Sequence, residues 1–134
     1  MILNTPDNFK SHLGQEAQLV EILNGIQQDV SEIHSIILVS SEGLPMASTR
    51  FDTSERDIVL SAMTAALINV AEQTSCELDK GDPTSLIIEC PQGLILLRRI
   101  NEDAVIAAIT YPGAKLGIVL LALKRAETKI LQVL

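Results

Sequence analysis

Apolar residues near the start of the chain recur at the spacing of one helical face. The steps are four or three residues, and the residues concerned are Leu19, Leu23, Ile26, Val30 and Ile33. This pattern predicts a first helix over about residues 16–31. The preceding segment is mostly polar, so we expect a flexible arm over residues 1–15, followed by a single domain over residues 16–134.

Short apolar runs separated by turn residues predict five strands. They span residues 35–40, 44–49, 85–90, 94–99 and 104–110. Ser41, Glu42 and Gly43 separate the first two runs, which indicates a β-hairpin. Short polar connections join the last three runs, as in an antiparallel meander. Residues 36–39 are all large and apolar, so we expect helices to cover both faces of the sheet.

Two further helices complete the predicted fold. Asp52, Thr53 and Ser54 form an N-cap region, and the helix that follows them runs to about Leu78. Residues 116–134 again have helical spacing. The predicted order is α-β-β-α-β-β-β-α, an α/β (α+β) fold with a five-stranded antiparallel sheet and helices on both faces.

The second predicted helix is apolar on nearly its whole circumference. A helix that lies on one sheet of a small monomer should carry a charged, solvated side, so this helix is expected to be covered twice. Small side chains would let a second helix approach closely, and symmetric pairing is the commonest way to supply one. The alternative is that alanine is simply the best helix former, and that sheet curvature buries more of the helix. We predict a homodimer whose helix interface contains Ile58, Ala62, Ala65, Ala66, Ile68 and Asn69.

Charge and hydropathy exclude several classes of partner. Ten basic against 17 acidic residues give a net charge of -7, which repels nucleic-acid phosphates. No apolar run approaches the roughly 18 residues of a membrane span, and the first residues do not resemble a signal peptide. We therefore expect a cytoplasmic protein without nucleic-acid partners or membrane insertion.

The sequence lacks the usual constellations of enzymes. Neither phosphate-binding glycine loops nor a Gly-x-Ser-x-Gly elbow is present. The two histidines are His12, in the predicted arm, and His34, at a helix-to-strand junction where local hydrogen bonding is the usual role. Cys76 and Cys90 have no CxxC spacing or neighbouring histidine, and we expect them to be buried free thiols. We predict no catalytic residues, no cofactor and no metal.

Three segments carry a family resemblance. The hairpin sequence SSEGLPMAS at residues 40–48, the helix segment AMTAAL at residues 62–67 and the Leu116-Gly117 pair resemble the roadblock, or dynein light chain, family. The resemblance includes the order of elements and extends over about residues 17–134. It implies a profilin-like architecture, and a dimer in which the second helices pack together and the third strands join two sheets. Leu86 and Ile88 would then belong to the interface.

The resemblance also implies a partner. Members of the bacterial or archaeal regulator-like branch would bind a Ras-like small GTPase, as a homodimer or a paralogous heterodimer, and activate or localise it. Arg98 and Arg99 are candidate GTPase contacts, because an arginine can stabilise charge in a GTPase active site. Adjacent strand residues point to opposite faces, so at most one could reach a bound partner. The alternatives are a passive dimerisation scaffold in a signalling or motor complex and a small-ligand sensor.

Overall fold

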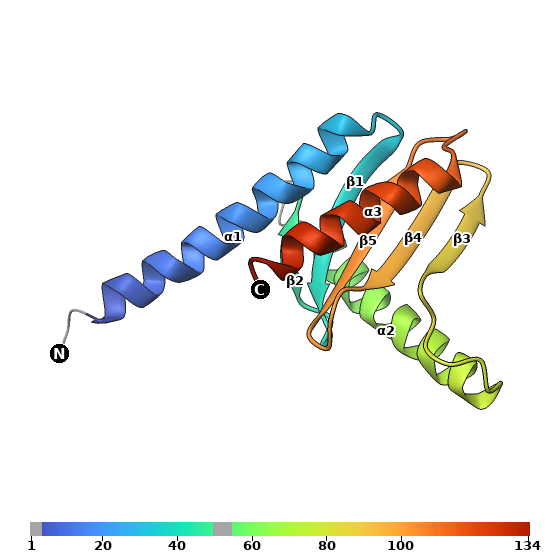
Figure 1. The fold of residues 1–134 in the computed structure, drawn as a ribbon, viewed down its shortest axis with the longest axis horizontal. Helices are drawn as coiled ribbons and strands as arrows, with labels where there is room; N and C mark the ends of the chain where they lie inside the picture. The colour runs from blue at the N-terminus through green and yellow to red at the C-terminus, as the bar shows by residue number, and fades with distance from the viewer. Residues whose placement is uncertain (1–3, 50–54) are drawn as a thin grey trace.

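The computed structural model describes residues 4–49 and 55–134, with side chains from residue 14 onward. The elements, coloured along the chain in Figure 1, follow the predicted order. They are α1 (Asn4–Asp29), β1 (Ile33–Ser40), β2 (Pro45–Ser48), α2 (Glu55–Glu77), β3 (Leu86–Cys90), β4 (Gly93–Arg99), β5 (Ala104–Thr110) and α3 (Leu116–Leu131). The predicted N-cap residues 52–54 lie outside the described residues.

The five strands form one antiparallel sheet in the order β2-β1-β5-β4-β3. In Figure 1, α1 and α3 lie on one face of this sheet and α2 lies on the other. This is the predicted arrangement of a profilin-like fold. The open edges belong to β2 and β3, because each of these strands pairs with one neighbour among the described strands.

Two apolar cores lie on the two faces of the sheet. The larger one joins α1 and α3 to the sheet and contains Leu23, Ile36 and Leu123, while the smaller one lies under α2 and contains Ile37 and Ile68. Ile36 and Ile37 are neighbours in β1 and point into different cores. The continuous apolar run of β1 is thus explained by burial on both sides.

The first helix differs from its predicted bounds. It begins at Asn4 rather than near Glu16, so the backbone of residues 4–15 is helical where an arm was expected. Pro6 does not prevent this, because the first turn of a helix makes no use of its N–H groups. At the other end, Ile33 begins β1 instead of continuing the helical face. The flexibility of residues 1–15 stays a prediction.

Candidate interaction surface

In α2, polar side chains lie on the buried side and apolar side chains on the exposed side, the opposite of an ordinary helix on a sheet. Its buried residues include the polar Asp57, Ser61 and Thr64. The Ser61 hydroxyl donates to the backbone carbonyl of Asp57, at 2.8 Å, which satisfies it inside the protein. The outward side is mainly apolar, and its exposed apolar residues are Ile58, Val59, Ala62, Met63, Ala66, Leu67 and Val70. Met63 and Val70 are 56% and 59% exposed, so the part of the chain that the structure describes leaves this surface uncovered.

The structure divides the predicted helix interface between two sides of α2. Ile58, Ala62, Ala66 and Asn69 are exposed. By contrast, Ala65 and Ile68 are 5% and 1% exposed and lie toward the sheet. These two residues therefore stabilise the protomer itself. Sequence reasoning did not place Val59, Met63, Leu67 and Val70 in the interface, although the structure exposes them beside it.

β3 forms a second uncovered feature next to α2. Leu86 and Ile88 are half-buried on the α2 side of the sheet, where they stand opposite Leu97 and Ile95 of β4. The strand contains no proline, and its register with β4 is regular. Proteins usually protect an open edge with prolines, charges or bulges. The β2 edge follows this rule, with Pro45 and an irregular register. β3 has one exposed charge, Glu89, but no proline and a regular register, so it is the better candidate for pairing with another chain.

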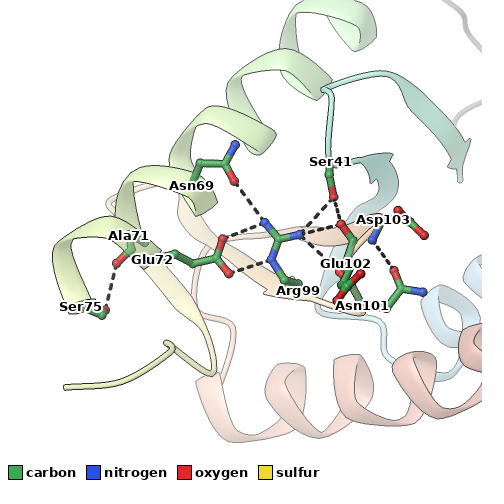
Figure 2. Close-up of polar contacts among 9 residues, drawn as sticks. All are labelled: Ser41, Asn69, Ala71, Glu72, Ser75, Arg99, Asn101, Glu102 and Asp103. Atoms are coloured by element: carbon green, nitrogen blue, oxygen red, sulfur yellow. Dashed lines mark hydrogen bonds and ion pairs between the residues drawn. The ribbon is translucent and has the colours of Figure 1, made fainter. Parts of the chain in front are cut away.

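Arg99 connects α2 to the rest of this surface (Figure 2). Its guanidinium donates from Nε to Glu72 Oε2, at 2.7 Å, and from Nη2 to Glu72 Oε1, at 2.8 Å. Further bonds reach Asn69 Oδ1, at 3.2 Å, and Ser41 Oγ, at 3.1 Å. The hydrogen bond with Glu72 raises the pKa of Arg99. The network fixes α2 relative to the end of β4 and to the β1–β2 turn.

Arg98 points to the opposite face of the sheet, as expected for the neighbour of Arg99. It donates to Ser85 Oγ, at 2.8 Å, and forms an ion pair of 3.1 Å with Glu127 of α3. Both predicted GTPase contacts are therefore engaged within the protomer. Neither arginine can extend toward a partner unless its internal ion pair breaks.

The expectation that both cysteines are buried is wrong. Cys76 and Cys90 are free thiols, but both are exposed rather than buried. Cys76 lies in the last turn of α2, and Cys90 ends β3 at the open edge, so the apolar core does not reach either of them. Within the described residues, no three potential ligands come together as a metal site, and none of the helices has the length and hydropathy to cross a bilayer.

His34 has local contacts. Its Nδ1 lies 3.3 Å from the Ser35 hydroxyl, and its ring meets the ring of Tyr111 edge-on at 5.1 Å between centroids. Its backbone carbonyl accepts a bond from Gln27 Nε2, at 2.8 Å. The structure thus gives His34 neighbours in α1, β1 and the segment after β5.

Comparisons with known proteins agree with this fold. The Roadblock/LC7 domain model matches residues 19–110. MglB from Myxococcus xanthus is similar, with a TM-score of 0.78 and 15% identity over 86% of this chain and 93% of that chain. The roadblock/LC7 domain from Streptomyces avermitilis has a TM-score of 0.77 and 16% identity, over 83% and 92%. Profilin from Schizosaccharomyces pombe has a TM-score of 0.60 and 10% identity, over 83% and 94%.

Curated protein sequences gave no match. Because all three structures have low identity to this chain, they show the shared profilin-like fold alone. The family model is more informative, since it covers more than half of the chain. On that match, this protein belongs to the Roadblock/LC7 domain family.

Proposed function

We propose that this protein is a non-enzymatic, homodimeric interaction module of the cytoplasm that binds and regulates a Ras-like small GTPase. The observation that carries the proposal is the apolar outward side of α2, formed by Ile58, Val59, Ala62, Met63, Ala66, Leu67 and Val70. A contiguous apolar surface of this kind is typical of a protein interface. We call these seven residues the α2 surface.

A second copy of the chain is the proposed cover for part of the α2 surface. The alanines leave room for close approach of another helix, and the flanking Met63 and Val70 supply apolar area at their edge. The half-buried Leu86 and Ile88 of β3 continue this apolar area on the sheet. A symmetric dimer would bury both features in a single interface.

The GTPase partner rests on the family resemblance. The structural neighbours include MglB proteins from Myxococcus xanthus and Thermus thermophilus, the latter described as a gliding protein. Two copies of α2 would present a composite surface to the switch regions of the GTPase. Since Arg98 and Arg99 are held by Glu127 and Glu72, we propose that regulation acts by positioning the GTPase's own groups rather than through an arginine of this chain.

The same ion pairs favour a passive scaffold as the second candidate. A dimer without a free arginine could hold larger proteins together and leave nucleotide chemistry unchanged. A groove of about 350 Å³ between α2 and the sheet, lined in part by Ser35, Asp57 and Ile95, supports the weaker sensor hypothesis. This volume lies at the low end of ligand sites. A thermal-shift panel of metabolites tests that hypothesis.

The deciding experiment is size-exclusion chromatography with light scattering. The purified chain is mixed with each Ras-like GTPase of the same organism, loaded with a GTP analogue or with GDP. Regulation is supported if two copies of the chain bind one or two GTPase molecules when the GTPase carries the GTP analogue, but not when it carries GDP. A dimer that binds no GTPase in either state favours the scaffold, and a monomer at micromolar concentration contradicts both.

A further inference from the structure

We propose that the outward side of α3 is a docking surface for an acidic amphipathic helix of a partner protein. The surface consists of Ile118, Leu121, Lys124 and Arg125, and we call it the α3 surface. All four residues are exposed. The surface lies on the face of the sheet opposite α2 (Figure 1), so the proposal goes beyond the proposed function and does not depend on it.

The first half of the α3 surface is apolar. Ile118 and Leu121 are 43% and 51% exposed, and their spacing of three residues makes them neighbours on one side of the helix. The buried residues of α3, among them Val119, Leu123 and Ala126, join the helix to the sheet instead. Ile118 and Leu121 belong to neither apolar core. Core packing therefore does not explain these two large side chains.

The second half of the α3 surface is basic. Lys124 and Arg125 form no ion pair within the described residues. Glu127, the single acidic residue of α3, is already paired with Arg98, at 3.1 Å. The helix dipole favours cations in the last turn of a helix, and in α3 that turn contains Lys129. Lys124 and Arg125 precede it, so the dipole does not explain them.

The charge of this surface is opposite to that of the whole chain. The net charge is -7, whereas α3 contains three basic residues and one acidic residue. Exposed apolar side chains beside unpaired cations fit a partner that combines an apolar side with carboxylates. Salt screens charges beyond about 8 to 10 Å, so the more distant carboxylates of the chain oppose this attraction only weakly.

The neighbouring helix favours a narrow partner over a membrane. α1 lies beside α3 on the same face of the sheet (Figure 1). From residue 14 onward, the exposed charged residues of α1 are Glu16, Glu21 and Asp29, all of them acidic. A flat anionic bilayer that touched α3 would also approach these carboxylates, which would repel it. A single helix can lie along α3 without covering α1.

The two halves of the surface also set the direction of the partner helix. The basic half follows the apolar half along α3. Carboxylates are most favourable near the N-terminus of a helix, so a partner antiparallel to α3 would place its acidic first turn beside Lys124 and Arg125. Ile118 and Arg125 are seven residues apart, which is two turns, or about 10 Å. The acidic and apolar residues of the partner should therefore be about two turns apart.

Selection from a displayed peptide library tests the proposal. The peptides have about 20 residues, long enough to form a helix in isolation, with acidic, basic and apolar residues randomised on one side. The full chain is the target, and its Lys124→Glu, Arg125→Glu variant removes peptides that bind elsewhere. We expect carboxylates in the first turn and apolar residues about two turns later. Selection of basic peptides, or of none that requires the α3 surface, overturns the proposal.

The binding of one selected peptide is then measured by fluorescence anisotropy. We expect Arg125→Glu and Leu121→Ser each to weaken it at least tenfold, and affinity to fall as salt is raised. A peptide with lysines in place of its carboxylates should prefer the Arg125→Glu variant. Lys80→Glu makes the same charge change at an exposed position outside α3 and should bind normally. Equal losses for Lys80→Glu and Arg125→Glu would show an effect of net charge and contradict the proposal.

Two further measurements address the other occupants of this surface. Light scattering should give the same assembly size for the unchanged chain and for the Lys124→Glu, Arg125→Glu variant, and a smaller variant would mean that a second copy covers α3. Neither protein should sediment with phosphatidylglycerol vesicles. Sedimentation of the unchanged chain alone would assign the surface to a membrane. Either result overturns the proposal, whereas failure of the proposed dimer leaves it standing, because one protomer contains the whole surface.

Discussion

Arg99 and Glu72 form a two-bond ion pair that joins the end of β4 to α2, with donor–acceptor distances of 2.7 and 2.8 Å. The same guanidinium also reaches Ser41 in the β1–β2 turn. A planar fork that donates to both carboxylate oxygens fixes direction as well as distance. Arg99 therefore helps to set the orientation of α2, and with it the direction of the α2 surface, beside the core packing of Ile68.

Replacing Arg99 with lysine should loosen α2. Lysine keeps the charge but cannot make the paired bonds to Glu72 and the bond to Ser41 at once. Because Arg99 and Glu72 are 24% and 26% exposed, solvent screens part of the interaction, and we expect a loss of about 1 kcal/mol in the free energy of unfolding. Urea denaturation measures it. Arg125→Lys, at an exposed position of α3, is the matched control and should change stability little.

The pH dependence of this effect follows from the raised pKa of Arg99. A raised pKa means that the stabilisation is complete below the unfolded-state pKa and is lost only as the pH rises through the folded-state value. Both values lie above the working range of pH, so the cost of Arg99→Lys should stay constant between about pH 6 and 9. A cost that changed across this range would show that another titrating group dominates the contact.

Met63→Glu should separate the dimer without unfolding the protomer. The side chain is 56% exposed, so the isolated subunit can solvate a carboxylate there. In a helix-to-helix interface the same charge would be buried without a partner, and we expect the dimer to weaken by at least about 30-fold, or about 2 kcal/mol. Light scattering over a dilution series measures this change, and circular dichroism reports the fold.

The control for Met63→Glu is Leu121→Glu on α3. Leu121 is similarly exposed, at 51%, but lies on the other face of the sheet. It should leave the dimer intact. If both variants dissociate, net charge rather than the α2 surface explains the effect, since each adds one negative charge to a chain of net charge -7.

Glu32 contacts the start of α3 from a distant part of the sequence. Its Oε2 accepts a bond of 2.6 Å from the Lys115 N–H, and its carbonyl accepts one of 2.9 Å from the Tyr111 N–H. The carboxylate also lies at the positive end of the helix dipole. Glu32→Ala should cost about 1 kcal/mol, seen as a lower Tm. Glu21→Ala, at an exposed position of α1, should leave the Tm nearly unchanged.

The sequence predicts the order of elements well because β1, β3, β4 and β5 each contain a short apolar run, and turn residues separate the strands. It could not predict which side of α2 meets the sheet. Apolarity normally identifies the buried side of a helix, but here Ser61 and Thr64 face inward while Met63 and Val70 face outward. When apolar residues surround a helix, their spacing does not indicate which side is buried. The sequence therefore assigns Ala65 and Ile68 to the interface, although both lie inside the protomer.

The sequence also could not predict contacts between segments that lie far apart along the chain. Nothing local marks Glu32 as a partner of Lys115, just before the helix that begins at Leu116, or Ser41 as a partner of Arg99, because folding alone brings these residues together. The exposed cysteines belong to the same class. A small apolar side chain is usually buried, and only the position of β3 at the sheet edge leaves Cys90 uncovered.

Gly43 tests the contact between the β1–β2 turn and α2. Its φ is +91°, and a Cβ atom there would lie 3.1 Å from the Cα atom of Ala62. Two features therefore disfavour alanine at this position: the left-handed backbone conformation, and the close approach of the added Cβ to the backbone of α2. Gly43→Ala should cost about 1 to 3 kcal/mol, measured by urea denaturation.

Gly25→Ala is the opposite case and serves as the control. Gly25 lies within α1, where an added Cβ would have no neighbour within 4 Å, so alanine should stabilise the helix by about 0.5 to 1 kcal/mol. Opposite signs for the two substitutions would confirm that the turn is locked against α2. A neutral Gly43→Ala would mean instead that the turn can move away from Ala62, and the position of α2 would then rest on the Arg99 network and on the packing of Ala65 and Ile68 against the sheet.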